Sequence, residues 1–220
     1  MKSRADTILS RVRGPRVLDV GCAGHTFEIG SPHWLHGRLD AIYPELHGID
    51  VSRENIEALR SRGFRNLHLQ SAESFDLEER FDTIVAGELI EHLSNPGLFL
   101  DCARRHLTPG GRVVLTTPSP FALFNFLYAL IKYPKTCENP QHTAWFCLRT
   151  LSELVGRHGL KITEMELIPD YYPDNPSRLY RSFVKLIGAL GALVPSRLRN
   201  NAILAVLEPL QDASHTGKSA

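Results

Sequence analysis

One short stretch of the chain places three side chains capable of acid–base or metal chemistry close together. Glu88, Glu91 and His92 follow directly after an apolar run, Phe81–Ala86, that is typical of a buried strand. On a helix, residues three or four positions apart share a face, so this spacing predicts that the three side chains converge on one patch. Such groups can take a proton from a hydroxyl or amine, or bind Mg, Mn or Zn. Each residue also has an alternative role without chemistry. Glu88 could be a capping residue, Glu91 a salt-bridge partner, and His92 a hydrogen-bonded histidine of a turn.

A second stretch, Arg16–His25, predicts a buried parallel strand that ends in a carboxylate and then a tight turn that opens a helix. Small residues let the backbone approach a ligand closely, and the N–H groups at the start of a helix favour negatively charged groups. The candidate ligand-binding residues of this turn are Asp19, Gly21, Cys22, Ala23 and Gly24. By itself, the turn is equally consistent with a plain connection from strand to helix.

A third stretch, Leu46–Ser52, repeats this pattern with a short strand that ends in Asp50. Ser52 is a natural N-cap for a helix over Arg53–Ser61. In a doubly wound sheet, ligands bind beyond the carboxyl ends of the strands, where the strand order reverses. An acid that ends the second strand is well placed to accept hydrogen bonds from both hydroxyls of a ribose. The sequence therefore favours ribose binding over simple capping for Asp50.

Together with three later stretches, these residues resemble the motifs of the class I S-adenosylmethionine-dependent methyltransferases. The five matching stretches, in chain order, are Val17–Cys22, Gly48–Ser52, Gln70–Glu73, Phe81–Leu93 and Leu107–Leu115. The first loop of that family usually has alternating glycines, whereas this chain has Ala23 and His25 on either side of Gly24. The resemblance implies an α/β fold with a Rossmann-like, doubly wound, seven-stranded sheet that is mostly parallel and has an antiparallel last strand.

The same resemblance implies that S-adenosylmethionine is the cofactor. Val51 and Ala72 would supply apolar faces to its adenine, and Glu73 would lie near the adenine amine unless it is a solvated loop acid. The methyl group would lie beyond Gly87, near the end of the fourth strand. The full set of expected cofactor-binding residues is Asp19, Gly21, Cys22, Ala23, Gly24, Asp50, Val51, Ala72, Glu73 and Gly87.

The Glu-x-x-Glu-His pattern of residues 88–92 resembles two groups within this family. One group is the ubiquinone-biosynthesis O-methyltransferases. The other methylates the 2′-hydroxyl at small-RNA ends and uses this motif, with a further histidine, to bind a divalent metal. We expect His92, Glu88 and His142 to be the catalytic residues, with His92 as a candidate general base and His142 facing the substrate. In the metal alternative, which the sequence does not favour, His142 is the candidate fourth ligand.

Composition limits the classes of function that fit this chain. It has 220 residues, 43% of them hydrophobic and 22% charged, which is typical of a soluble globular protein. The formal net charge is +1, so there is no global basic footprint for nucleic acid. No apolar run is long enough to span a bilayer, and the first residues lack the apolar core of a signal peptide. The four cysteines show no CxxC pairing, so we expect reduced thiols in a cytoplasmic protein.

We expect one methyltransferase domain over residues 1–209 and a disordered polar tail over 210–220. An apolar insertion at about 119–142 follows the fifth predicted strand. Its segment 121–133 is nearly apolar all round, which favours a lid over the substrate and leaves a helix in contact with lipid as the alternative. Hydrophobic spacing predicts further strands over Phe64–Gln70, Arg112–Thr117, Leu160–Ile168 and Ala202–Leu207, and helices over Ala5–Val12, Leu98–Leu107, Arg149–Gly159 and Leu179–Leu193.

These features favour transfer of a methyl group to oxygen on a small acceptor of apolar or glycolipid-like character. The insertion and the segment 26–44, which matches no motif, would select the acceptor. The alternatives are a metal-dependent enzyme that methylates RNA ends and a non-catalytic partner protein that keeps the cofactor fold. A nicotinamide dehydrogenase fits poorly, because Gly21, Ala23 and Thr26 do not form GxGxxG and Asp50 lies too far along the chain.

Overall fold

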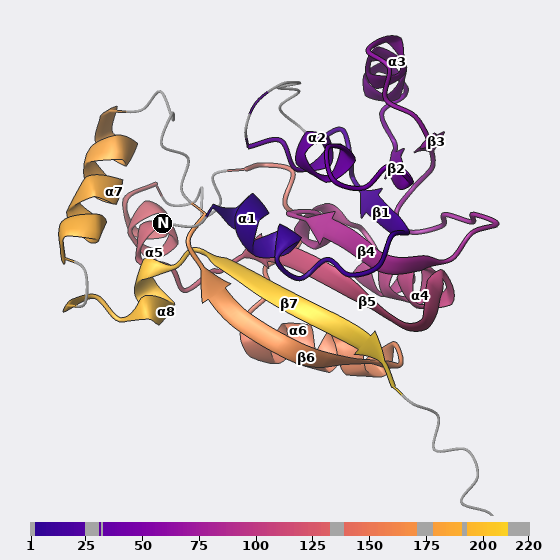
Figure 1. Cartoon of the computed structure of the whole chain (residues 1–220). Coiled ribbons are helices and arrows are strands. Elements are labelled where there is room, and N and C mark those ends of the chain that lie inside the picture. Colours follow the sequence, from indigo (N-terminus) through magenta and orange to yellow (C-terminus); the bar gives the residue numbers. More distant parts are fainter. Residues whose placement is uncertain are drawn as a thin grey trace, which may run out of the picture.

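The computed structural model describes residues 3–24, 31, 33–132, 139–170, 178–190 and 193–210, and in this part of the chain helices surround a central sheet (Figure 1). The strands are β1 (Val17–Val20), β2 (Leu46–Asp50), β3 (Leu67–Leu69), β4 (Phe81–Gly87), β5 (Leu107–Pro118), β6 (Leu160–Ile168) and β7 (Ala202–Pro209). The helices are α1 (Arg4–Leu9), α2 (Leu35–Asp40), α3 (Arg53–Ser61), α4 (Pro96–Arg105), α5 (Leu123–Lys132), α6 (Leu148–Arg157), α7 (Arg178–Leu190) and α8 (Ser196–Arg199), with a short 3₁₀ helix, η1 (Ile90–His92).

The sheet has seven strands in the order β3-β2-β1-β4-β5-β7-β6. Strands β1 to β5 pair in parallel, and β7 runs antiparallel to both of its neighbours, β5 and β6. This confirms the predicted doubly wound sheet with an antiparallel last strand. The chain changes direction across the sheet between β1 and β4, so the topology favours a ligand beyond the carboxyl ends of these two strands.

Apolar cores on both faces of the sheet explain why the central strands carry apolar residues at successive positions. In β4, Ile84 and Ala86 belong to the core that includes α4 and α6, whereas Val85 belongs to the core that includes α1 and α2. Alternate residues of Ala202–Leu207 in β7 divide between the two cores in the same way. Successive side chains of a strand point to opposite faces, so a strand covered on both sides has no solvated position.

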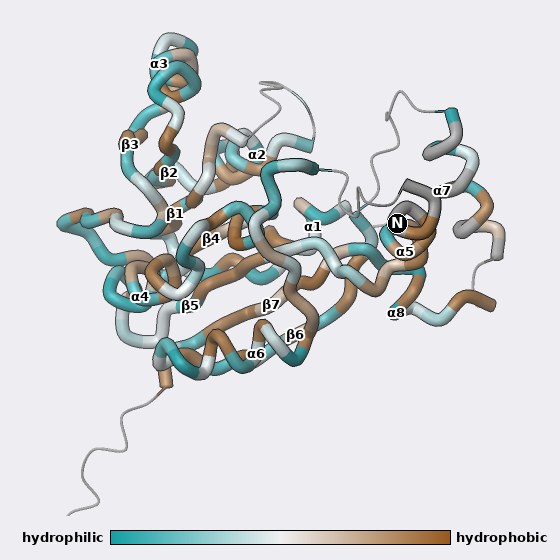
Figure 2. Tube along the Cα trace, turned by 180° about the vertical axis from the view of Figure 1, so that it is seen from behind, coloured by the Kyte–Doolittle hydropathy of each residue, from teal (hydrophilic) through white to brown (hydrophobic). Residues whose placement is uncertain are grey.

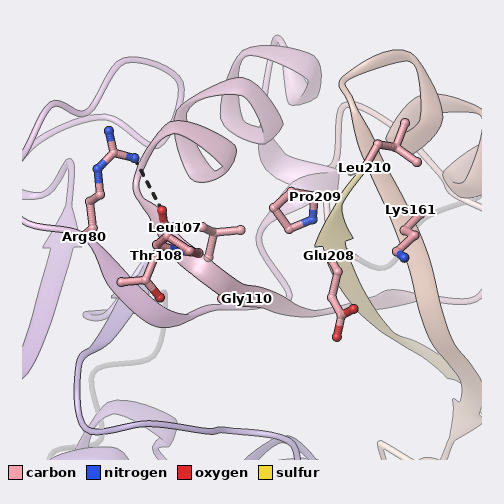
Figure 3. Close-up of a pocket in the computed structure, with 10 residues that line it drawn as sticks. Arg80, Leu107, Thr108, Gly110, Lys161, Glu208, Pro209 and Leu210 are labelled. Atoms are coloured by element: carbon pink, nitrogen blue, oxygen red, sulfur yellow. Dashed lines mark hydrogen bonds between the residues drawn. The ribbon is translucent and has the colours of Figure 1, made fainter. Parts of the chain in front are cut away.

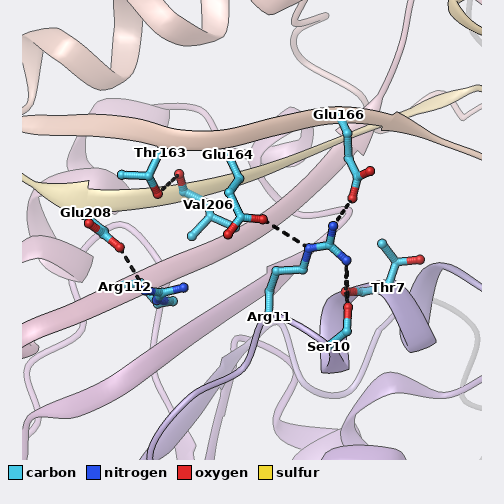
Figure 4. A network of polar contacts seen from close by, with 9 residues as sticks. All are labelled: Thr7, Ser10, Arg11, Arg112, Thr163, Glu164, Glu166, Val206 and Glu208. Carbon is cyan, nitrogen blue, oxygen red and sulfur yellow. Dashed lines mark hydrogen bonds and ion pairs between the residues drawn. The ribbon is translucent and has the colours of Figure 1, made fainter.

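Helix α1 is tied by ion pairs to the edge of the sheet and to α2. Arg11, just after α1, lies between Glu164 and Glu166 of β6, and its Nε is 3.5 Å from Glu164 Oε2 (Figure 4). Asp6 of α1 accepts a hydrogen bond from Arg38 of α2 at 2.6 Å. Such partly exposed pairs add little stability individually. These pairs instead hold α1 in place, and the first turn of α1 reaches the end of β4.

The largest difference from the predicted boundaries lies between α4 and β5. The strand predicted over Arg112–Thr117 begins earlier, at Leu107, because Leu107 pairs with Phe81 at the start of β4. The helix predicted over Leu98–Leu107 therefore ends at Arg105. Leu107 fits both the helical spacing before it and the strand after it, so hydrophobic periodicity alone could not assign it.

Several predicted segments lie partly outside the described residues. These outlying parts are residue 25 of the first loop, 26–30 and 32 of the segment 26–44, 133–138 of the insertion, 191–192 of the helix predicted over Leu179–Leu193, and 211–220 of the tail. Within the described residues, the segment 26–44 forms α2 and the insertion forms α5. None of the helices described is long and apolar enough to cross a lipid bilayer.

Gly48 of β2 occupies a position where a side chain has no room. An added Cβ would lie 2.8 Å from His36 Cε1 and 2.9 Å from Cys22 Sγ. We expect Gly48→Ala to lower the free energy of unfolding by about 1–3 kcal/mol through overpacking, measured by urea denaturation. Gly156 in α6 is the matched control, because an added Cβ there meets nothing within 4 Å. Gly156→Ala should raise the free energy of unfolding by up to about 1 kcal/mol; equal effects of the two substitutions would contradict the close packing around β2.

Candidate active site

The turn after β1 is bound to the end of β2. The N–H groups of Gly21 and Cys22 both donate to the carbonyl of Ile49, at 2.9 Å and 3.1 Å. Gly21 and Gly24 have φ angles of +80° and +60°, a conformation that favours glycine. An added Cβ at Gly21 would also lie only 3.1 Å from Leu89 Cδ1. Gly21 and Gly24, both predicted to bind cofactor, are therefore favoured by the backbone of the turn itself.

The carboxylate of Asp50 links this turn to the turn after β2. Its Oδ2 accepts a hydrogen bond from the N–H of Ala23 at 3.0 Å, and its Oδ1 accepts one from the N–H of Ser52 at 2.9 Å. A carboxylate offers about four acceptor positions, so further positions are left for the hydroxyls of a ribose. The next residue, Val51, is 71% exposed, as suits an apolar side chain that a bound ring would cover. These residues fit a nucleoside.

Asp19 and the residues of α2 support the turn from inside the protein. Asp19 is buried, and its Oδ2 lies 3.0 Å from Nδ1 of the buried His36. The ring N–H of Trp34 donates to the carbonyl of Cys22 at 3.1 Å. The rings of Trp34 and His36 both pack near the ring of Phe64. The sequence predicts a cofactor contact for Asp19, and the structure adds a buried partner that the motif did not reveal.

Glu73 holds the chain that leads into α4. Its Oε1 accepts hydrogen bonds from the backbone N–H groups of Ser94 and Asn95, at 2.8 Å and 3.1 Å, and its Oε2 accepts one from the Asn95 side chain at 3.2 Å. Ala72 beside it is buried. The contacts of Ala72 and Glu73 with adenine stay predictions, and the carboxylate of Glu73 already has a structural use.

The segment Glu88–His92 does not form the α-helix that its spacing predicts. Gly87 ends β4, and Glu88 follows with a φ of +51°, a left-handed conformation that interrupts any helix. The N–H of Glu88 donates to the carbonyl of Thr116 in β5 at 3.0 Å. The chain then turns as η1 over Ile90–His92. Tertiary contacts, and not a shared helix face, position the three candidate side chains.

Glu88 lies beside the first turn of α1. Arg4 Nη1 is 3.6 Å from Glu88 Oε1 and 3.0 Å from Asp170 Oδ2. Burial, followed by the nearby charge of Glu91, raises the pKa of Glu88 well above its ordinary value, while Arg4 acts in the opposite direction. This arrangement favours a protonated Glu88.

Glu91 is buried between β5 and the chain before α6. Its Oε2 accepts a hydrogen bond from the hydroxyl of Thr117 at 2.9 Å, and its backbone carbonyl accepts one from the N–H of Thr143 at 2.8 Å. The other carboxylate oxygen, Oε1, is buried and has no hydrogen-bond partner in the described part of the chain. Burial is the main cause that raises the pKa of Glu91 to about 7. A carboxyl group of this kind can exchange a proton near neutral pH.

The fold brings His142 from a distant part of the chain to this carboxyl group. One ligand atom each of Glu91, His92 and His142 lie within 4.8 Å of one another. The two imidazole rings meet edge to face with 4.6 Å between their centroids, and Trp145 packs against His142 in turn. One carboxylate and two imidazoles suit Zn or Mn, and the Oε1 of Glu91 fits such an ion. Glu88 does not belong to this group.

Sequence reasoning missed several residues that shape this site. Arg4 and Asp170 both lie more than 80 residues from Glu88 along the chain, and no spacing connects them with it. Thr117, which binds Glu91, could have been found, because a run of threonines at the end of an otherwise apolar strand is a sign of polar partners.

A separate surface pocket of about 390 Å³ lies at the opposite end of the sheet (Figure 3). Leu107 and Thr108 at the start of β5 and Glu208 at the end of β7 line it. Since β5 is parallel to β4, this is the amino end of both strands, away from the residues that follow β4. We exclude this pocket from the candidate active site.

The chain is similar to known proteins over most of its length. A family model described as a methyltransferase domain matches residues 2–165. The ubiquinone biosynthesis O-methyltransferase of Nitrobacter winogradskyi is 36% identical over 116 residues, which cover 50% of this chain and 41% of that protein. The chain spans about half the length of the curated relatives that it matches.

Two solved structures show the same fold. A SAM-dependent methyltransferase from Archaeoglobus fulgidus matches with a TM-score of 0.63 and 17% identity, over 93% of this chain and 90% of its own. The N-methyltransferase NodS from Bradyrhizobium japonicum, in complex with S-adenosyl-L-homocysteine, matches with a TM-score of 0.56 and 17% identity, over 94% of this chain and 86% of its own. At this level of identity, the likeness establishes the Rossmann-like fold.

The raised pKa of Glu91 makes the stability of the metal-free protein depend on pH. The folded protein keeps a proton on Glu91 up to about pH 7, whereas the unfolded chain releases it near the ordinary value of 4.5. The free energy of unfolding should therefore fall as the pH rises through this window, by up to about 3 kcal/mol from this group. Glu91→Gln should flatten the profile and be more stable than the wild type above pH 7, measured by denaturation with a chelator present.

Glu57→Gln is the control for this measurement, because the Glu57 side chain is 62% exposed. It should follow the wild-type profile. Parallel profiles of Glu91→Gln and the wild type would show instead that Glu91 is ionised in the folded protein at neutral pH.

Proposed function

Since the chain belongs to the methyltransferase domain family, among the class I S-adenosylmethionine-dependent methyltransferases, we propose that it transfers a methyl group from S-adenosylmethionine to an oxygen atom of a small, apolar acceptor. The observation that carries this proposal is the Glu91–His92–His142 cluster at the same sheet edge as the turn held by Asp50. The strands β1 and β4 are parallel neighbours, so the residues that follow them lie at the same edge of the sheet. Similarity to curated O-methyltransferases supports oxygen as the methylated atom.

S-adenosylmethionine, when bound, supplies a methyl group on a positively charged sulfur. Asp50 would hold the ribose hydroxyls, and the turn over Gly21–Gly24 would lie against the cofactor. His92 would accept the proton of the acceptor hydroxyl at a ring nitrogen as the oxygen displaces the neutral thioether from the methyl carbon, and His142 would orient that hydroxyl. Glu91, in its ionised form, would stabilise the charged imidazole.

The insertion over residues 119–142 would cover the acceptor within a methyltransferase domain of residues 1–209. Its start is fixed to the sheet, since the side-chain amide of Asn125 in α5 donates to the carbonyl of Ser119 at 2.8 Å. Ala122, between them, is buried. These contacts support a lid anchored at the end of β5.

A second candidate function, metal-dependent 2′-O-methylation of RNA ends, is favoured by the close approach of Glu91, His92 and His142. A divalent ion held by these three residues would act as a Lewis acid on the acceptor hydroxyl. The net charge of +1 provides no global attraction for RNA, which favours the small acceptor.

Removal of the charge on Asp50 tests the cofactor site. Asp50→Asn keeps the shape of the side chain, and we expect it to weaken binding of S-adenosylmethionine and of its demethylated product about 10- to 100-fold, because a hydrogen bond to a charged group contributes about 1.5–3 kcal/mol. Isothermal titration calorimetry measures this. Asp76→Asn is the control, since that side chain is 99% exposed. Unchanged affinity of Asp50→Asn would refute the ribose contact, and absence of binding by the wild type would favour the scaffold alternative.

Substitution of His92 tests the proton transfer. His92→Ala should bind S-adenosylmethionine like the wild type and turn over a small phenolic acceptor about 10²- to 10⁴-fold more slowly. His158→Ala is the control, because His158 pairs with Asp101 at 3.0 Å, outside the site. Loss of cofactor binding and turnover together would indicate a structural role for His92. If EDTA abolishes turnover, and His142→Ala removes the binding of Mn or Zn, the metal-dependent function is favoured.

A further inference from the structure

Large apolar side chains are exposed mainly on two segments of the described chain. Eleven such side chains are more than a third exposed, and six of them lie within 121–130 and 186–198. These six are Phe121, Phe126, Leu130, Leu186, Leu193 and Leu198. The exposed fraction reaches 69% at Leu130 and 84% at Leu193. A group of exposed apolar side chains of this size marks a contact surface.

The same segments lack acidic residues. No Asp or Glu occurs within 113–137 or within 178–207, although the whole chain has 24 acidic and 25 basic residues. Arg178, Lys185 and Arg197 have exposed side chains in this region. Although the basic and acidic residues of the whole chain nearly cancel, these segments carry positive charges without nearby acidic residues in the sequence, among exposed apolar side chains.

The sheet register brings both segments to one edge. Pro118 at the end of β5 pairs with Ala202 at the start of β7, which pairs with Ile168 at the end of β6. The chain therefore leaves for α5, and for α7 and α8, from the carboxyl edge that also carries Glu91. Figure 1 places the three helices at one end of the molecule, and Figure 2 shows brown, hydrophobic residues on α5, on α7 and next to α8. We name the six apolar and three cationic side chains the apolar–basic face.

We propose that the apolar–basic face docks the protein on an anionic lipid surface. The cations attract lipid phosphates, and the phenylalanine and leucine side chains enter the boundary between head groups and acyl chains. A nucleic acid would use the cations and leave the leucines in water, and a second copy of this chain would bring positive charge against positive charge. Lipid contact thus extends beyond the segment 121–133 to α7 and α8. Its consequence, that an apolar acceptor reaches the site from the membrane, rests on the proposed function.

Co-sedimentation of the full chain with vesicles tests the docking. The vesicles contain phosphatidylcholine with or without phosphatidylglycerol, and we expect binding only with phosphatidylglycerol, weakening as salt is raised. Combined Arg178→Glu, Lys185→Glu and Arg197→Glu should lower the partition coefficient at least about 100-fold, because each cation near an anionic surface contributes a factor of about five.

The matched control reverses three exposed cations on other elements, Arg65, Arg104 and Lys161, and so has the same net charge. It should bind the vesicles nearly as well as the wild type. Phe126→Ser combined with Leu130→Ser should remove the binding that persists at high salt. Equal loss in both charge-reversed variants, or absence of vesicle binding by the wild type, would overturn the proposal.

Two further results would assign the face to another occupant and overturn the proposal. One is a dimer, seen by light scattering, that the Phe126 and Leu130 substitutions dissociate. The other is binding of RNA that depends on Arg178, Lys185 and Arg197 while vesicle binding does not. Calorimetry with S-adenosylmethionine should give wild-type affinity for every variant of the face, which separates failure of docking from failure of the proposed function.

Discussion

The candidate site depends on hydrogen bonds between the ends of two neighbouring parallel strands. β1 and β2 pair in register, and the turn after β1 donates two N–H groups to the carbonyl of Ile49 and one to the carboxylate of Asp50. These bonds satisfy backbone donors that a tight turn otherwise leaves unpaired. They also hold Asp50 at the point where the strand order of the sheet reverses. The turn after β1 and the carboxylate of Asp50 are therefore one unit, supported from within by Asp19 and His36.

After β4, at the same edge of the sheet, burial raises the pKa values of Glu88 and Glu91. Glu88 and Glu91 lie close enough for their charges to oppose each other, and Arg4 offsets this only in part. Removing a carboxylate from water without a full set of partners costs several kcal/mol. Groups with pKa values shifted in this way gather at functional sites, where a carboxyl group that exchanges a proton near neutral pH has a use. The same strands that make the core apolar thus deprive these acids of solvent.

The direction of the antiparallel strand β7 places additional helices near the candidate site. Because β7 runs antiparallel between β5 and β6, the connection that leaves β5 and the connection that leads from β6 into β7 share the carboxyl edge with Glu91. The segments α5, α7 and α8 lie outside the strands of the sheet and connect them at this edge. The fold in this way separates the candidate site, built at the ends of β1, β2 and β4, from the helices α5, α7 and α8 beside it.

The sequence alone was sufficient to locate the strands along the chain and the acids and glycines at the ends of β1 and β2, because each depends on a short local pattern. The doubly wound sheet with its antiparallel last strand was expected from the resemblance to a family. It failed at Glu88–His92, where the helical spacing gave the wrong geometry, since the backbone leaves β4 with a positive φ at Glu88. Only the tertiary structure decided that His142 reaches Glu91 and that Arg4 reaches Glu88. Periodicity reports neighbours along one regular element, whereas these contacts depend on how separate elements pack, and burial then decides which of the acids keep a proton.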